Sequence, residues 1–275
     1  MTSRQMDLAF CWCFPTESPE AGLRRLREYG FDGIELWPQH LQQYPVERWA
    51  EALARADLAC CQICPYFDFV HGPEKLRASR RMFDAYLSFA RRLGCRRIRV
   101  FTGPPWGEGV VSVRDANPRQ WADAAAALRE YCTTAAPDGV ELCLECHAGS
   151  LLENSTSTLK LIDAVGCSNL TVNLQLPLMG EDWPSSVAAL GSRTTHIHIH
   201  NWTHTIGQGE LTFLEAGAFD WRPVLSGLAK FESATALCLS VEHGDHGQRH
   251  DPWETARRDG AYLQKLRNHW RSQLQ

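Results

Sequence analysis

Short apolar segments with the character of strands recur eight times along this chain, and each is separated from the next by enough residues for a helix. The segments predicted as strands are residues 8–14, 32–37, 59–66, 97–102, 140–146, 170–176, 195–201 and 237–242. Strands joined by helices run parallel, and eight of them most simply close into a (β/α)8 TIM barrel. A doubly wound open sheet is the alternative, but the first strand-to-helix turn lacks a glycine-rich phosphate loop.

The spacing of apolar residues becomes helical between these strands, and capping signals mark the helix ends. The predicted helices are residues 19–29, 74–93, 118–132, 156–165 and 253–270. Proline follows a capping residue at Ser18, Asn117 and Asp251, where its fixed φ and missing N–H suit the first helical turn. Glycine, which accepts the left-handed conformation, stands at three predicted helix ends, at positions 30, 94 and 166.

The composition limits which classes of protein this chain can belong to. Hydrophobic residues form 44% of the 275 residues, enough for a sizeable core, and the net charge of −4 argues against a main role in binding nucleic acid. No stretch has the roughly 20 apolar residues that span a bilayer, and no export signal is recognisable. We therefore expect one cytoplasmic TIM-barrel domain over residues 1–275, with eleven reduced cysteines and no nucleic-acid or membrane partner.

Each strand of a barrel has one face toward the helices and one toward the interior, because alternate side chains point to opposite sides. The leucines and isoleucines suit the face toward the helices. The residues that then face inward are Glu35 and Trp37; Glu141, Cys143 and Glu145; Thr171, Asn173 and Gln175; His196, His198 and His200; and Cys238, Ser240 and Glu242. Buried carboxylates and imidazoles cost several kcal/mol each unless they are paired, protonated or bound to a cation.

Four of these inward residues lie on neighbouring strands, at the end where barrel enzymes build their sites: Glu145, Gln175, His198 and Glu242. Their oxygen and nitrogen donors suit Mn²⁺, Mg²⁺, Co²⁺ or Zn²⁺ better than a soft metal. The simpler interpretation is structural pairing, as Glu141 would form with Arg99 deep in the barrel. The coincidence on consecutive strands favours a metal site.

Five motifs make the chain similar to the sugar phosphate isomerase/epimerase superfamily, which has the xylose-isomerase-like barrel. The motifs are GFDGIELW at 30–37, VELCLECH at 140–147, HIHIHNW at 196–202, AFDW at 218–221 and LSVEH at 239–243. The resemblance covers nearly the whole chain. It implies a metal site of glutamate, aspartate, histidine and glutamate on strands five to eight, which falls by position on Glu145, Gln175, His198 and Glu242. The two glutamates commonly also act as the acid and base.

This chain departs from the family pattern at three places, which suggests a divergent member. Gln175 stands where a carboxylate is usual, and Leu178 stands where a histidine often follows. His200 and Asn201 replace the lysine and aspartate that usually continue the seventh strand. Glutamine can still ligate through its carbonyl oxygen, but the loss of one negative charge holds a metal less tightly and makes it a stronger Lewis acid. His200 is an alternative ligand.

The resemblance implies a metal-dependent isomerase or epimerase of a sugar, polyol or related keto compound. The metal would bind a carbonyl and its neighbouring hydroxyl, one of Glu145 and Glu242 would remove the adjacent proton, and the other would return it. The same site could instead run a lyase reaction, as a dehydratase or a C-glycoside-cleaving enzyme. A metal-free binding protein that has kept the barrel is a third possibility.

Further residues at strand ends are predicted to contact the substrate. The aromatic residues could pack on a sugar ring, Glu35 could bind a hydroxyl, and His147 could bond a developing oxyanion or stay solvated. The predicted substrate-binding set is Trp12, Glu35, Tyr66, Trp106, His147, His200 and Trp202. The expected cofactor is a divalent metal, with Mn²⁺ first and Mg²⁺, Co²⁺ or Zn²⁺ as alternatives. The expected partners are a small sugar or polyol and, since such barrels often pair through rim loops, a second copy in a homodimer.

Overall fold

Eight parallel strands close into a barrel in the computed structural model, which describes residues 5–11, 17–104, 107, 109–231, 236–242 and 250–273. The barrel strands are β1 (Gln5–Cys11), β2 (Gly33–Leu36), β3 (Ala59–Ile63), β4 (Arg97–Val100), β5 (Glu141–Glu145), β6 (Leu170–Gln175), β7 (Thr194–Ile199) and β10 (Ala236–Glu242). Each strand pairs with its neighbours in sequence order, and β1 closes the ring against β10. The predicted (β/α)8 TIM barrel is confirmed. The single domain over residues 1–275 stays a prediction.

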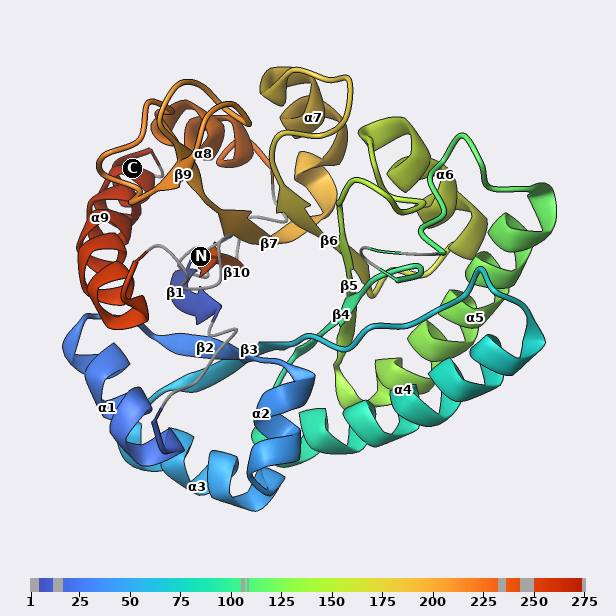
Figure 1. Ribbon diagram of the computed structural model, residues 1–275, viewed down its shortest axis with the longest axis horizontal. Helices are drawn as coiled ribbons and strands as arrows, with labels where there is room; N and C mark the ends of the chain where they lie inside the picture. The colour runs from blue at the N-terminus through green and yellow to red at the C-terminus, as the bar shows by residue number, and fades with distance from the viewer. Residues whose placement is uncertain are drawn as a thin grey trace.

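Helices form a ring outside the barrel (Figure 1). They are α1 (Pro19–Glu28), α2 (Pro38–Gln43), α3 (Val46–Ala56), α4 (Pro73–Leu93), α5 (Pro118–Ala135), α6 (Ser155–Val165), α7 (Trp183–Leu190), α8 (Arg222–Leu228) and α9 (Pro252–Ser272). The five helices that the sequence predicts by range are present, with ends shifted by no more than three residues. A small hairpin of β8 (Asn201–Trp202) and β9 (Leu211–Thr212) follows β7.

The predicted capping residues begin their helices. Asn117 Oδ1 accepts a hydrogen bond from the backbone N–H of Gln120 (3.1 Å), whose side chain accepts one from the Asn117 N–H (2.9 Å). Asp251 Oδ1 accepts from the N–H groups of Trp253 and Glu254, each at 2.9 Å. Such bonds satisfy N–H groups that have no partner within the helix.

Apolar side chains fill the layer between strands and helices. Leu142, Leu144 and Ile197 are fully buried there, and the alternate residues of the same strands face the barrel interior. One irregularity interrupts this alternation between β6 and β7, where Val172 pairs with Thr194 but Asn173 pairs with His196. The extra residue, Thr195, bonds inward to Thr171 (3.1 Å between hydroxyl oxygens). The alternation thus places polar groups inside the barrel.

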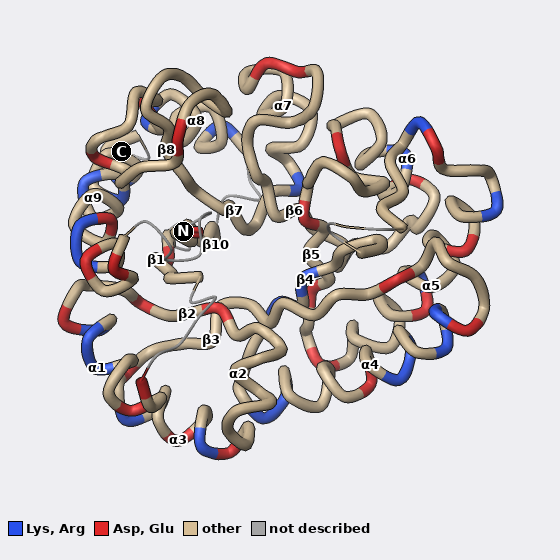
Figure 2. Tube along the Cα trace, viewed as in Figure 1, with Lys and Arg blue, Asp and Glu red and all other residues tan. Residues whose placement is uncertain are grey.

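The outer helices carry acidic and basic residues that are interspersed with one another (Figure 2). Within the part of the chain that the structure describes, no helix has both the length and the apolar character needed to cross a membrane.

Candidate active site

A pocket of about 460 Å³ opens at the carboxyl ends of the barrel strands. Seven predicted site residues line it: Tyr66, Glu145, His147, Gln175, His200, Trp202 and Glu242. Three of them are the last residues of their strands, β5, β6 and β10. His198 and Glu35 lie outside this lining and are fully buried. Trp12 and Trp106 lie outside the described residues.

His198 stands between two carboxylates beneath the pocket. Its Nδ1 is 3.1 Å from Glu145 Oε1 and 3.4 Å from Glu242 Oε2. One candidate ligand atom from each of these three buried residues lies within 4.8 Å of the others. Three strands, β5, β7 and β10, therefore bring together a nitrogen and two carboxylate oxygens, as the sequence predicts.

The other ring nitrogen of His198 decides what these atoms can do. Nε2 is 3.1 Å from Glu35 Oε1 and 3.1 Å from Asn173 Nδ2. The Glu35 carboxylate only accepts and favours a proton on Nε2, and the Asn173 amide can turn its oxygen, which has no partner among the described residues, toward that proton. The Nδ1 lone pair then faces two carboxylates, an arrangement that requires a cation, either a proton or a metal. Burial opposes protonation, but the charges of Glu35 and Glu242 outweigh it and raise the His198 pKa well above its usual value.

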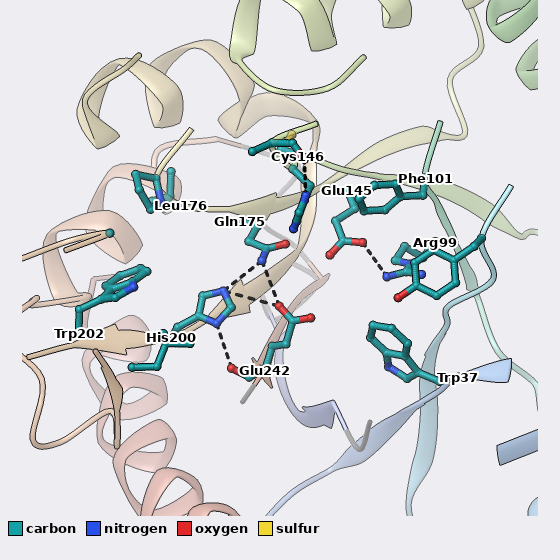
Figure 3. A pocket seen from close by; sticks show the side chains of 16 residues that line it. Trp37, Arg99, Phe101, Glu145, Cys146, Gln175, Leu176, His200, Trp202 and Glu242 are labelled. Carbon is teal, nitrogen blue, oxygen red and sulfur yellow. Dashed lines mark hydrogen bonds and ion pairs between the residues drawn. The ribbon is translucent and has the colours of Figure 1, made fainter. Parts of the chain in front are cut away.

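Gln175 adds a fourth potential metal ligand. Its Nε2 is 3.1 Å from Glu242 Oε2 and 3.2 Å from His200 Nε2. Both contacts are drawn as dashed lines in Figure 3. Its carbonyl oxygen Oε1 is buried and has no hydrogen-bond partner among the described residues. A buried carbonyl oxygen without a donor suits a cation. Glu145, Gln175, His198 and Glu242 thus fit a divalent metal, which these four residues would hold.

Arg99 on β4 binds Glu145, which corrects the expectation that it pairs with Glu141. Arg99 Nη1 is 2.8 Å from Glu145 Oε2, and both side chains are buried. Glu141 instead pairs with Arg97, the residue in register with it (3.3 Å between Nε and Oε2). The two arginines bind different glutamates because they lie two residues apart on β4. Their side chains therefore reach inward residues at different depths along β5.

The Arg99 guanidinium is enclosed by aromatic rings. Its carbon lies 4.5 Å from the centre of the Trp37 ring and 4.3 Å from that of Tyr66. Nη2 donates to the backbone oxygens of Cys64 and Pro65, each at 3.1 Å. Burial opposes the charge of Glu145, but the positive charge of Arg99 lowers the pKa of this carboxyl below its usual value. Arg99 therefore keeps Glu145 ionised.

The remaining acid and its histidine neighbour occupy the opposite wall of the pocket. Burial opposes ionisation of Glu242, yet His198 lowers its pKa to about 2. His200 Nδ1 is 3.0 Å from the Glu242 backbone oxygen and donates to it, which leaves Nε2 as the acceptor for Gln175. Burial lowers the His200 pKa. His200 is thus a neutral imidazole that fixes the Gln175 amide.

His147 follows β5 at the pocket rim. Its Nδ1 is 2.6 Å from the backbone oxygen of Ala148, and its ring packs on Phe101 with 5.2 Å between ring centres. Donation from Nδ1 leaves the other ring nitrogen, Nε2, as an acceptor in the neutral ring. The half-buried His147 thus has a defined tautomer with a lone pair available to a bound molecule.

The role of Arg99 and the contribution of Phe101 to the pocket were not predicted from the sequence. The signal for Arg99 was the pair Arg97 and Arg99 in an otherwise apolar strand, where both arginines face the interior. A single sequence does not give the register between two strands, so the partner of each arginine could not be predicted. Glu35 was predicted to contact the substrate, and this stays a prediction. The residue is fully buried in contact with His198 and lies outside the pocket lining.

The fold and the sequence together define a xylose isomerase-like TIM barrel, and the chain belongs to that family, whose family model matches residues 23–266. It is similar to a 3-dehydroshikimate dehydratase of Bacillus anthracis, with 26% identity over 230 residues, 78% of this chain and 80% of that protein.

Solved structures of low sequence identity share the fold. One is the probable 3-dehydroshikimate dehydratase AsbF of Bacillus anthracis, with a TM-score of 0.77 and 20% identity over 94% of this chain and 99% of the other. Another is an L-ribulose 3-epimerase, with a TM-score of 0.78 and 20% identity over 98% and 96%. A third is the IolI protein with bound zinc, with a TM-score of 0.73 and 17% identity over 96% and 99%.

Proposed function

We propose that this protein is a divalent-metal-dependent lyase that removes a proton next to the carbonyl of a small hydroxylated keto acid and eliminates water. The observation that carries this choice of reaction is the buried ion pair between Arg99 and Glu145 (2.8 Å). It favours a site with one base over a site with two. The sequence alone favoured an isomerase or epimerase, which we place second.

The metal part of the proposal rests on the four converging donors. Glu145, Gln175, His198 and Glu242 would hold the ion, and a bound divalent cation would supply a Lewis acid for the substrate carbonyl oxygen. The relatives include a protein with bound zinc in this fold. Mn²⁺ is the first ion to test, because the donor set is rich in oxygen, and Mg²⁺, Co²⁺ and Zn²⁺ are the alternatives.

Glu145 is poorly suited to accept a proton from substrate. Protonation would leave Arg99 as a buried cation without its counter-charge, and breaking such a pair costs about 3–5 kcal/mol. An epimerase with Glu145 and Glu242 as its two bases would meet this cost in every turnover. A lyase needs only one residue to remove the proton and to return it to the leaving group.

His147 is the base in this proposal. Its Nε2 takes the proton from the carbon next to the carbonyl, and the electron pair of the broken C–H bond forms a C=C bond to the next carbon. The C–O bond at that carbon breaks, and the hydroxyl leaves with the proton from His147 as water. The Nδ1 donation to Ala148 holds the ring with Nε2 ready to accept.

The charge of the pocket favours an anionic substrate. Gln175 is neutral where the family usually has a carboxylate, and Arg99 adds a positive charge to the lining. Both features make the pocket less negative and favour a substrate with a carboxylate. Tyr66, Phe101 and Trp202 provide flat apolar surfaces for a ring. The similarity to a 3-dehydroshikimate dehydratase supports a hydroxylated cyclic keto acid.

Epimerisation of a sugar is the second candidate. It is favoured by the placement of Glu145 and Glu242 on either side of His198 Nδ1. The structural likeness to L-ribulose 3-epimerase and D-allulose 3-epimerase agrees with this candidate.

A homodimer also stays a prediction.

Product analysis separates the two reactions. Protein loaded with Mn²⁺ is incubated with 3-dehydroshikimate and, separately, with ketohexoses and ketopentoses in D₂O. Dehydration gives an unsaturated product lighter by one water, whereas epimerisation conserves mass apart from one deuterium taken from solvent. A deuterated sugar epimer with no reaction of the keto acid would overturn the lyase proposal.

A further inference from the structure

A carboxylate is buried inside the barrel directly beneath the candidate metal site. Glu35, on β2, is fully buried, and its oxygens are surrounded by potential donors. Oε1 is 2.8 Å from His196 Nε2 and 3.1 Å from His198 Nε2. Oε2 is 3.0 Å from the Cys64 thiol and 3.4 Å from Gln62 Nε2. An isolated buried carboxylate is costly, and these contacts offset the cost.

Two contacts of Glu35 reach one ring, because both of its oxygens lie near His198 Nε2 (3.1 and 3.2 Å). A neutral imidazole carries one proton, so a proton on Nε2 leaves Nδ1 with its lone pair. The alternative tautomer would carry the proton on Nδ1 and donate it to Glu145 or Glu242, where it would block a metal. Glu35 disfavours that tautomer, because two acceptors would then face each other. The Asn173 amide, whose Nδ2 is 3.1 Å from Nε2, fits either tautomer, since its unpartnered oxygen can take the place of the nitrogen.

We infer that Glu35 is a positioning residue: it accepts the Nε2 proton of His198 and so directs the Nδ1 lone pair toward the metal. The inference rests on the metal site of the proposed function and gives Glu35 a role without substrate contact. Carboxylates behind metal-binding histidines commonly set ring orientation and basicity. His196 shares Oε1 with His198 and therefore holds the carboxylate in place.

Another group of potential metal ligands lies on the Nε2 side of the His198 ring and consists of Cys11, Glu35 and His198 itself. The Trp37 indole N–H donates to Cys11 Sγ across 3.2 Å, and the His198 Nε2 proton is directed at Glu35. A proton on His198 Nε2 occupies the ring nitrogen that an ion at this group would need. This arrangement agrees with a hydrogen-bonding role for Glu35.

Zinc titration compares the wild type with Glu35→Gln and Cys64→Ala in the full chain. Glutamine keeps the size of Glu35 and one acceptor but loses the charge and adds a donor that opposes the ring N–H groups. We expect Glu35→Gln to weaken zinc binding by about 10–100-fold. Cys64→Ala removes a different hydrogen bond to the same carboxylate, and we expect zinc affinity within about threefold of the wild type. Equal affinity of Glu35→Gln and the wild type would overturn the inference.

A second measurement needs no variant at Glu35. In long-range ¹H–¹⁵N spectra of the zinc-loaded wild type, we expect His198 to show a protonated Nε2 and a metal-bound Nδ1. A metal-bound Nε2 overturns the inference even if Glu35→Gln does not fold. Glu242→Gln serves as the reference for loss of the site. Absence of metal binding by the wild type overturns the proposed function and this inference together, whereas an unchanged Glu35→Gln overturns the inference alone.

Discussion

Arg99 and Glu145 form an ion pair inside the barrel, with 2.8 Å between Nη1 and Oε2 and side-chain exposures of 1% and 2%. Because Oε2 faces Arg99 and Oε1 faces His198, the two oxygens of Glu145 serve different partners. The pair thereby fixes the carboxylate that the sequence predicts as both ligand and base.

Loss of Arg99 should destabilise the protein strongly. Arg99→Met would leave the Glu145 carboxylate buried without its partner, and we expect the free energy of unfolding to fall by about 3–5 kcal/mol. Arg91→Met is the matched control, because Arg91 and Asp138 form an exposed pair whose loss should cost at most about 1 kcal/mol. Urea denaturation of the metal-free proteins measures both changes. Similar small losses in both variants would show that the buried pair contributes little.

His147 should matter for the rate and not for metal binding. We expect His147→Ala to lower kcat of the proposed dehydration by about 10²–10⁴-fold, because a general base contributes that much, with metal affinity unchanged. His204→Ala, at an exposed position of the loop between β8 and β9, is the control and should leave kcat unchanged. Steady-state kinetics and zinc titration give the two quantities. A His147→Ala enzyme with wild-type kcat would assign proton removal to another residue.

Gln175 offers a test of the charge at the metal site. Gln175→Glu restores the negative charge of the family pattern at the end of β6, and Coulomb attraction should tighten metal binding about tenfold or more. The same change places two carboxylates together in the metal-free protein, because Gln175 Nε2 now donates to Glu242 Oε2. Metal should therefore raise the melting temperature of the variant more than that of the wild type. Calorimetric titration and thermal melts check both expectations, and weaker binding by the variant would contradict a ligand at this position.

The alternation of side chains along strands allowed much of the site to be predicted. Glu145, His198 and Glu242 meet as expected, because inward residues at the ends of parallel strands must converge. The pairing of Arg99 was not accessible, because it depends on the stagger between β4 and β5. Thr195 was missed as an inward residue because a register shift beside it interrupts the alternation. Helix α3 follows Pro45 with no side-chain cap, so it lacked the start signal that α1, α5 and α9 have.

A buried acid outside the pocket lining gives the protein a pH dependence of its own. Asp259 on α9 is 2% exposed and accepts a hydrogen bond from the Leu214 N–H (2.8 Å). Burial raises its pKa from 3.8 to about 7, although the Leu214 bond and the charge of Arg258 oppose this change. Between about pH 4 and pH 7 the folded state therefore binds a proton that the unfolded state has lost. The contribution of Asp259 to stability falls as the pH rises through this window.

Asp259→Asn should remove this dependence while the amide oxygen keeps the bond to Leu214. We expect the wild type and the variant to have similar stability near pH 4, and the variant to be more stable at pH 8. Each unit of pKa corresponds to about 1.4 kcal/mol, so the gain is limited to a few kcal/mol. Urea denaturation at several pH values gives the difference between the two proteins, which cancels the titration of all other groups. A difference that is constant from pH 4 to pH 8 would mean that Asp259 ionises in the folded protein as it does in the unfolded chain.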